Sequence, residues 1–533
     1  MRERLVCRMK PYIQPFERAL ALAELSAIAH SEPVPVDRDT ERPVIFSLPP
    51  RIKPAALARH LAYWEVIEAD RRYVTTQVQR ERTFSVVRNG VPTKEIRQGL
   101  LFDEMALPNR RCLRYGTHGL HEYRGKFFPQ LVRALINVAG VPRRGVVGDP
   151  MCGSGTTAVE AILGGYQALG LDMNPLSVLM TRVKCSLLKI DPQFLTTSYE
   201  RIRGQLSRSK GKRNGPLTYF GSLPTNDRAY LSGWFSEHVL WDLDEVARAI
   251  QGSDEMVRDF FWLCLSNIIR SVSWQKDDDL RVRKQPDLDT EIDAVREFLE
   301  ELGRSVRVVL AFLYHDEETP STSFDVAEGD ARALAVAWGR RKGKIDTIIT
   351  SPPYATALPY LDTDRLSLSY LGLLSRVEHR RRDQHMIGNR EISEAQRAAY
   401  WRLFESRESR LPESVAMMIK KIIILNSEVD VGFRRRNLPA LLTKYFADMQ
   451  QVFEGIMTVL RPGGPAFVVI GNNHTIAGGE RVEIATASLL IDIASAVGMK
   501  LERRIPMEML LSRDIFKKNA VVSEEILCFQ TPA

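Results

Sequence analysis

One segment of the chain constrains its fold more than any other: a glycine-rich turn between a short apolar strand and a helix. The turn is Asp149-Pro150-Met151-Cys152-Gly153-Ser154-Gly155. An apolar run at 145–148 precedes it, and a helical pattern begins at Thr156. A second apolar strand at 168–172 ends on Asp172. Strand, helix and strand in this order predict a parallel βαβ unit.

The residues of this turn favour a nucleotide-type ligand. Glycines let the backbone turn tightly and approach a ligand closely. Asp172 lies about twenty residues beyond Gly153, the spacing at which an acidic residue bonds both ribose hydroxyls. No Gly-Lys-Ser or Gly-Lys-Thr follows Gly155, which disfavours an ATP phosphate loop, and the turn lacks the GxGxxG pattern of dehydrogenases.

A second chemical segment is Ser351-Pro352-Pro353-Tyr354, which follows a predicted strand at 346–350. Two consecutive prolines fix φ and remove two backbone donors, so the loop is a rigid set of acceptors. Ser351 and the Pro352 carbonyl could accept hydrogen bonds from an exocyclic amino group, and Tyr354 could stack on a flipped base. The alternative is a simple strand exit, which the glycine turn and Asp172 in the same chain disfavour.

Together these segments resemble the S-adenosylmethionine-dependent DNA methyltransferases that modify exocyclic amino groups. The stretch 149–157 resembles their cofactor motif, 170–175 their ribose-binding strand end, and 351–354 their catalytic loop. Further matches are the motif with His121, Tyr123, Lys126, Phe127 and Pro129, the acidic turn 328–332, which in the family contacts adenine, and the glycine turn 461–464.

The resemblance implies S-adenosylmethionine as cofactor, no metal, and two sets of residues. The catalytic loop would be Ser351, Pro352, Pro353 and Tyr354. The cofactor-binding residues would be Lys126, Phe127, Asp149, Pro150, Cys152, Gly153, Gly155, Thr156, Asp172, Met173, Asp330 and Ala331.

In this family SPPY marks mainly cytosine N4 enzymes, whereas DPPY or NPPY is commoner among adenine N6 enzymes. The resemblance therefore implies methylation of cytosine N4 in duplex DNA, by base flipping and direct in-line transfer. Carbon-5 methylation is disfavoured, because it needs a Pro-Cys loop and the chain has no Pro-Cys pair. Adenine N6 methylation, methylation of an RNA base amino group and a non-enzymatic DNA-binding role remain the alternatives.

The charge of the chain favours a polyanionic partner. Lys and Arg number 74 against 66 Asp and Glu, a formal net charge of +8. Basic residues concentrate beyond the catalytic loop, where we expect contacts with DNA phosphates rather than merely solvated helix faces. The residues expected to bind DNA are Arg380, Arg381, Arg382, Arg390, Arg434, Arg435 and Arg436. Double-stranded DNA is the expected partner, with a cognate restriction endonuclease as a further one.

The order of the predicted elements indicates a doubly wound, mostly parallel α/β sheet of the Rossmann-like class I methyltransferase type, with an antiparallel hairpin at its C-terminal edge. We expect an N-terminal accessory region at 1–110, including a strand near Phe84–Val87, a catalytic domain at 111–189, 324–375 and 445–533, a helical insertion at 190–323, and a basic target-recognition region at 376–444.

Cysteine spacing and hydropathy predict the compartment. The six cysteines form no CxxC pair, which fits a reducing environment. No run of about 18 apolar residues offers a membrane span. The sequence therefore predicts a cytoplasmic protein.

Overall fold

The computed structural model describes the chain except for residues 1–3, 37–41, 89–110, 124, 126, 210–215, 277–282, 285–291, 316–321, 356–359, 390–391, 407–409, 428, 430–431 and 509–522. Within the described residues, no helix combines the length and the apolar character needed to cross a bilayer.

A seven-stranded sheet forms the centre of the molecule, with strand order β13-β14-β10-β9-β6-β7-β8. Its strands are β6 (Val146–Asp149), β7 (Gln167–Asp172), β8 (Phe324–Glu328), β9 (Thr347–Thr350), β10 (Pro465–Gly471), β13 (Lys500–Glu508) and β14 (Ser523–Gln530). The pairs from β10 to β8 are parallel, and β14 runs antiparallel between β10 and β13. The predicted Rossmann-like sheet and its C-terminal edge hairpin are thus confirmed.

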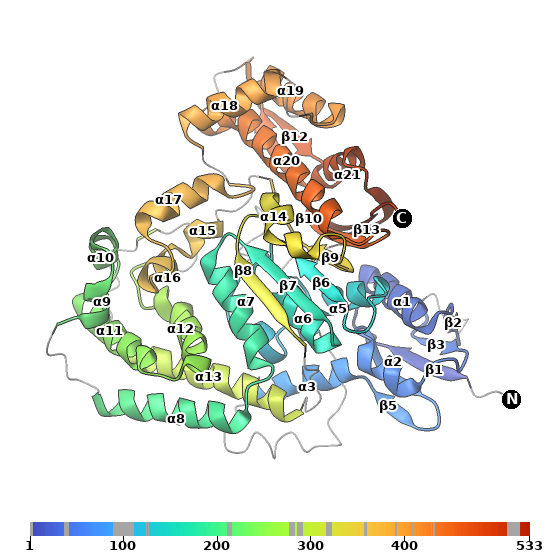
Figure 1. Ribbon diagram of the computed structural model, residues 1–533, viewed down its shortest axis with the longest axis horizontal. Helices are drawn as coiled ribbons and strands as arrows, with labels where there is room; N and C mark the ends of the chain where they lie inside the picture. The colour runs from blue at the N-terminus through green and yellow to red at the C-terminus, as the bar shows by residue number, and fades with distance from the viewer. Residues whose placement is uncertain are drawn as a thin grey trace.

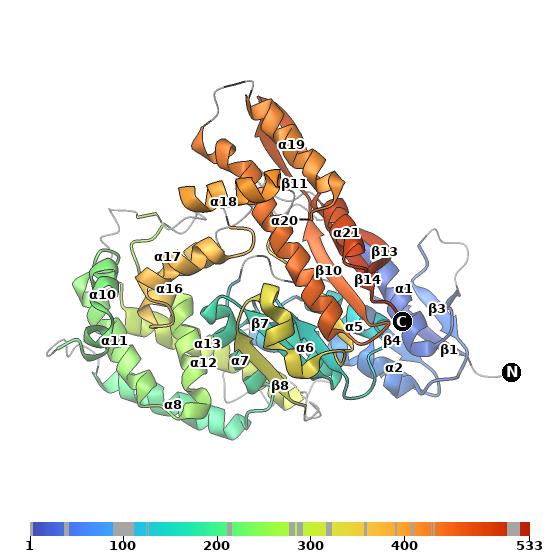
Figure 2. The ribbon, with the colours of Figure 1, turned by 45° about the horizontal axis from the view of Figure 1, so that its top comes forward.

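Helices cover both faces of this sheet, because alternate residues of its buried strands point to opposite sides. On one side, strand residues such as Val147 and Ile349 pack with α5 (Pro129–Val138) and α6 (Thr156–Gly164). On the other side, residues such as Val146 and Ile348 pack with helices that come later in the chain. Those helices are α14 (Leu334–Ala337), α20 (Phe433–Val459) and α21 (Thr486–Ala496), and Figure 2 shows α20 running along β10.

A helical lobe stands between β7 and β8 in the chain and follows α7 (Pro175–Leu187) (Figure 1). It consists of α8 (Pro192–Ser209), α9 (Thr218–Ser222), α10 (Thr225–Ser232), α11 (Glu237–Gln251), α12 (Glu255–Ile269) and α13 (Ala294–His315). The helix α16 (Arg365–Tyr370) also packs in the apolar core of this lobe. The Tyr219 hydroxyl of α9 donates to the Tyr370 carbonyl at 2.6 Å. The chain just after the loop 351–354 therefore packs on this lobe.

The short helix α15 (Tyr360–Thr363) precedes α16. Beyond α16 the chain forms α17 (Arg376–His385), α18 (Glu394–Glu405), α19 (Glu413–Ser427), and the hairpin of β11 (Asn473–Ala477) and β12 (Glu480–Ile484). In both views α17 lies between the helical lobe and the group formed by α18, α19 and α20 (Figures 1 and 2).

The N-terminal region forms a separate five-stranded antiparallel sheet in the order β2-β3-β1-β4-β5. Its elements are β1 (Leu5–Met9), α1 (Pro15–Ala29), β2 (Val34–Pro35), β3 (Ile45–Leu48), α2 (Pro54–His60), β4 (Trp64–Glu68), β5 (Arg72–Val74) and α3 (Thr76–Arg88). The strand predicted near Phe84–Val87 is wrong, since these residues lie in α3. Residues 77–82 are mostly Gln, Arg and Glu, which favour a helix. Because helix formation is cooperative, the helix that they begin continues through the β-branched residues that follow.

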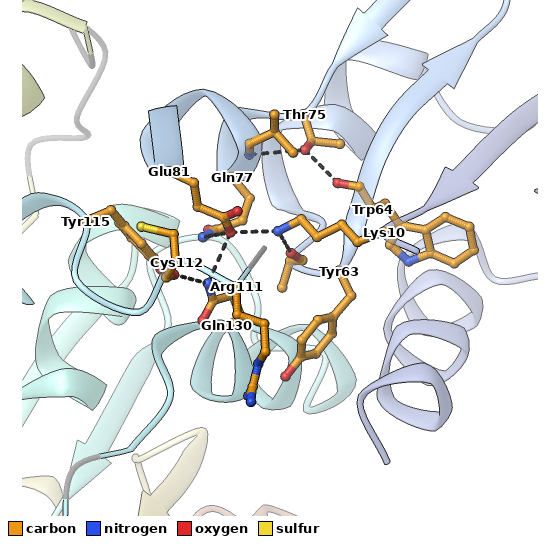
Figure 3. Close-up of polar contacts among 12 residues, drawn as sticks. Lys10, Tyr63, Trp64, Thr75, Gln77, Glu81, Arg111, Cys112, Tyr115 and Gln130 are labelled. Atoms are coloured by element: carbon orange, nitrogen blue, oxygen red, sulfur yellow. Dashed lines mark hydrogen bonds and ion pairs between the residues drawn. The ribbon is translucent and has the colours of Figure 1, made fainter. Parts of the chain in front are cut away.

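A buried polar cluster joins this N-terminal sheet to the catalytic core (Figure 3). Lys10 Nζ donates to Glu81 Oε1 at 2.6 Å and to the Ala62 carbonyl at 2.9 Å. Glu81 Oε1 also accepts from Gln130 Nε2 of α5 at 3.1 Å. Lys10 and Glu81 are only 2% and 1% exposed, so removing either partner would leave a buried charge, at a cost of about 3–5 kcal/mol.

Candidate active site

The glycine turn lies at the carboxyl end of β6, where its backbone adopts conformations that side chains rarely allow. Gly153 has φ 48° and Gly155 has φ 80°. A Cβ on Gly155 would lie 2.7 Å from Thr181 Oγ1, too close for any other residue without a shift of α7. The start of α6 is therefore packed closely against α7. Gly153 has no side chain, so a ligand can approach the backbone of the turn there.

Asp172, at the end of β7, fixes the shape of this turn. Its Oδ2 accepts from the Gly153 amide at 2.8 Å, and its Oδ1 accepts from the Asn174 amide at 2.8 Å. Each carboxylate oxygen has a further lone pair, so these bonds leave acceptors for a ligand. Asp172 is thus oriented by backbone amides rather than by a cation.

Asp149 is the second buried carboxyl of the pocket. Its Oδ1 accepts from the Met151 amide at 3.1 Å and from Thr350 Oγ1 at 2.8 Å. Burial raises the pKa of Asp149 to about 7 and the pKa of Asp172 to about 6. A positively charged ligand would favour the ionised form of both groups. Among the described residues, no group of three or more His, Cys, Asp or Glu is arranged to hold a metal ion.

The loop 351–354 emerges from β9 beside the glycine turn. Thr350 at the end of β9 bonds Asp149, so the loop and the turn are directly connected. The Tyr354 hydroxyl donates to Glu524 Oε1 from β14. Gly388 packs against the loop, since a Cβ there would lie 2.9 Å from the Tyr354 carbonyl oxygen. The loop is therefore held from several sides.

The turn, Asp172 and the loop line one pocket that is partly open to solvent. The predicted residues that line it are Phe127, Asp149, Pro150, Cys152, Gly153, Thr156, Asp172, Met173, Ala331, Ser351, Pro352, Pro353 and Tyr354. The structure thus brings the loop and most of the predicted cofactor residues together.

Two predicted cofactor residues stand apart from that lining, and a third, Lys126, lies outside the described residues. Gly155 is the N-cap of α6, behind the pocket surface. The Asp330 carboxylate accepts from Arg332 Nη2 at 2.6 Å, and Arg332 Nη1 donates to Asp448 of α20 at 2.9 Å. Asp330 therefore takes part in an ion-pair network beside the pocket, while its neighbours Gly329 and Ala331 line it.

The pocket also contains residues that sequence reasoning did not assign to the site. These are Gly125, Met151, Ser154, Asn174, Gly329, Met386, Ile387 and Glu524, while Tyr123 was noted only as part of a motif. Ser154, Met151 and Asn174 lie inside or next to recognised motifs and could have been included. Met386, Ile387 and Glu524 come from distant elements, and no local pattern marks them.

The residues expected to bind DNA fall into two groups. Arg380 and Arg381 of α17 are exposed, as are Arg435 and Arg436 at the start of α20. Arg382 instead donates to Glu328 and, at 3.1 Å, to the Met173 carbonyl. Arg382 therefore pairs with residues beside the glycine turn, and its contact with DNA phosphates stays a prediction. Arg390 and the side chain of Arg434 lie outside the described residues.

Comparisons with known proteins agree with this site. Residues 121–185 match the family model described as RMKL-like, methyltransferase domain. The type II methyltransferase M.MvaI of Kocuria varians is 25% identical over 266 residues, 48% of this chain and 58% of that protein. The type II methyltransferase M.BsoBI of Geobacillus stearothermophilus is 22% identical over 445 residues, 75% of this chain and 83% of that protein. The chain thus spans little more than half the length of M.MvaI.

The solved structure of TrmN from Thermus thermophilus aligns with 12% identity and a TM-score of 0.31, covering 99% of both chains.

The strand order is that of the Rossmann-like methyltransferase fold expected from the sequence, and residues 121–185 match a methyltransferase domain model. The chain is similar to the type II methyltransferases M.MvaI and M.BsoBI, which agrees with the resemblance that its motifs indicate.

The residues of the pocket fit S-adenosylmethionine, the methyl donor that the similarity to methyltransferases implies. The cofactor carries a positively charged sulfonium and an ammonium group, and the pocket presents two buried carboxyl groups, Asp149 and Asp172. Beside them lie apolar surfaces such as Phe127 and Met173 and a glycine turn without side chains at Gly153.

Proposed function

We propose that this chain transfers a methyl group from S-adenosylmethionine to the N4 amino group of cytosine at a specific site in double-stranded DNA. One observation carries the proposal: the SPPY loop and the glycine turn with Asp172 share one pocket. The resemblance of SPPY loops to those of cytosine N4 enzymes supports the choice of base. The names of the relatives, which are type II methyltransferases, support DNA as the substrate.

In this proposal each half of the pocket has its own task. Asp172 accepts from the ribose hydroxyls, and the turn around Gly153 lets the cofactor approach the backbone. When bound, the cofactor supplies an electrophilic methyl group. Ser351 and the Pro352 carbonyl hold the amino group of the extruded base, and the ring of Tyr354 stacks on it.

The exposed arginines of α17 and α20 would hold the duplex. Arg380, Arg381, Arg435 and Arg436 contact phosphates in this proposal, and residues 376–444 form the target-recognition region. The same chain would work in the cytoplasm, beside an endonuclease that cleaves the same unmodified sequence.

The test is nucleoside mass spectrometry of duplex DNA and of RNA incubated with the protein and S-adenosylmethionine carrying a deuterated methyl group. We expect deuterated N4-methylcytosine from DNA alone. Ser351→Ala should lower turnover by roughly one to two powers of ten, the scale of one lost hydrogen bond in a transition state. N6-methyladenine as the sole product would refute the base assignment, and label in RNA alone would refute the substrate class.

A further inference from the structure

Acidic residues lie on both sides of the loop 351–354, at the ends of neighbouring strands along the same edge of the sheet. In the order β14-β10-β9-β6-β7, the loop leaves β9, and Asp149 and Asp172 end the strands on one side of it. On the other side, Glu524 of β14 pairs in register with Gly471 at the end of β10. Because β14 runs antiparallel, its first residues reach the same edge of the sheet as the loop. Glu524 thus faces the loop from the side opposite the cofactor motif.

The two sides use their carboxyl groups differently. Asp149 and Asp172 accept from the backbone amides of Met151, Gly153 and Asn174, and Asp149 also accepts from the Thr350 hydroxyl. Glu524 accepts from the hydroxyl of Tyr354, a residue of the catalytic loop itself. Both Glu524 and Tyr354 line the pocket. Glu524 is therefore an acidic side chain of the pocket lining that contacts Tyr354 of the loop directly, from the side away from Asp149 and Asp172, which we call the base side.

The next residue on β14, Glu525, has different partners from Glu524 and serves as a comparison. Successive side chains of a strand point to opposite faces. Glu525 accepts from Arg504 Nη2 at 2.7 Å and from Asn472 Nδ2 at 3.0 Å, and it does not line the pocket. Glu525 is an ion-paired structural residue, whereas Glu524 has a phenol for its partner and an open pocket beside it.

Amino methylation is a reaction in which a negatively charged group of this kind would help. The amino nitrogen bonds the methyl carbon while the carbon–sulfur bond breaks with its electron pair on sulfur, and the nitrogen is left positively charged with one proton too many. The loop begins with Ser351, a neutral acceptor at pH 7, and carries no charge of its own. A negative group near the nitrogen would stabilise that charge in the transition state.

We propose that Glu524 is a catalytic residue of the base side: its carboxylate stabilises the amino nitrogen as it becomes positive and accepts the proton that the nitrogen releases. Glu524 then passes this proton to water, which restores the carboxylate. Tyr354 holds the carboxylate in place through its hydroxyl. Burial raises the pKa of Glu524, which makes it a better proton acceptor than an exposed glutamate. This assignment rests on the proposed amino-methyltransferase function.

Four variants separate a catalytic charge from a merely structural contact. Glu524→Gln keeps an oxygen that can accept from Tyr354 but removes the charge, and Glu524→Asp keeps the charge. Tyr354→Phe removes the hydroxyl and keeps Glu524. Glu525→Gln on the same strand is the matched control. Single-turnover methyl transfer to duplex DNA and calorimetric binding of S-adenosylmethionine are measured for each.

We expect Glu524→Gln to slow transfer by roughly a hundredfold, the scale of a lost general base, while cofactor affinity is unchanged. Glu524→Asp should transfer faster than Glu524→Gln, Tyr354→Phe should be slowed by less than about tenfold, and Glu525→Gln should match the wild type. The proposal is overturned if Glu524→Gln transfers like the wild type, because the hydrogen bond to Tyr354 would then be its whole role. A wild-type protein that methylates no amino group would instead refute the proposed function, and the Glu524 assignment with it.

Discussion

In the proposed function the pocket has a cofactor side, around the glycine turn and Asp172, and a base side, around the loop 351–354, and the two sides are built in different ways. The cofactor side comes from two consecutive strands, β6 and β7, whose ends at 149–156 and 172–173 lie close in the sequence. The base side combines the loop 351–354, the segment 386–388 and Glu524, which the fold brings together from distant positions. A cofactor shared by a whole class can be bound by one local motif, whereas a target base is enclosed by elements from several parts of the chain.

The cofactor side also rests on a paired, fully buried charge cluster. Glu160 of α6 accepts from Arg133 Nε at 2.8 Å and from the Tyr115 hydroxyl at 2.6 Å, and it contacts His118 Nε2 at 2.8 Å. All four side chains are buried. Burial alone would raise the pKa of Glu160, but Arg133 and His118 hold it at about 2. The helix that follows the glycine turn is therefore fixed to α5 by charge as well as by apolar packing.

The largest effect should come from removing that support. Glu160→Ala leaves Arg133 buried without its carboxylate, so the free energy of unfolding should fall by about 3–5 kcal/mol. Urea denaturation followed by circular dichroism measures this. Glu200→Ala, which removes an exposed i,i+3 pair with Arg203, is the matched control and should cost no more than about 0.5 kcal/mol. Equal losses in the two variants would show that the cluster does not support the turn.

A smaller effect should appear in the pH dependence of cofactor affinity. The pKa values of about 7 for Asp149 and about 6 for Asp172 mean that both carboxyl groups lose their charge as the pH falls through these values. Since the cofactor is positively charged near its methyl group, its affinity should fall about tenfold or more between pH 8 and pH 5. Calorimetric titration at several pH values measures it. Asp172→Asn should flatten the curve, and a pH-independent wild type would contradict the prediction.

The smallest effect concerns the arginines of α17. Neutralising Arg380 and Arg381 should weaken binding to all duplex sequences and reduce the slope of log K against log salt by roughly 2, because each lost phosphate contact releases one fewer counterion. Fluorescence anisotropy at several salt concentrations measures the slope. Arg382→Ala should leave the slope unchanged and weaken cofactor binding instead, since Arg382 bonds the Met173 carbonyl. A changed target sequence in the double variant would mean that Arg380 and Arg381 contact base edges.

What the sequence could predict follows the same division of the pocket. The turn around Gly153 and the spacing to Asp172 are local, so they predicted the βαβ unit and the cofactor side. The loop 351–354 was recognisable because its prolines are contiguous. Glu524 was not, because one glutamate on a late strand has no pattern until the sheet order places it beside Tyr354.

Two segments show how contacts between distant residues add to the local pattern. Arg382 follows Arg380 and Arg381 directly in the sequence, but in the structure it forms an ion pair with Glu328, a residue of another element. Phe84–Val87 has the composition of a strand, but the helix that begins at Thr76 continues through it. In both cases, interactions beyond the local pattern decided the structure.

The most direct test of the divided pocket is calorimetric binding of S-adenosylmethionine to Asp172→Ala and to Tyr354→Ala, each compared with methyl transfer by the same protein. Asp172→Ala should weaken cofactor binding by roughly 1–3 kcal/mol, the cost of leaving the ribose hydroxyls without their charged acceptor. Tyr354→Ala should bind the cofactor as the wild type does and lose transfer, since stacking on an extruded base is worth about 1–3 kcal/mol. Equal losses of cofactor affinity in both variants would contradict the division of the pocket into a cofactor side and a base side.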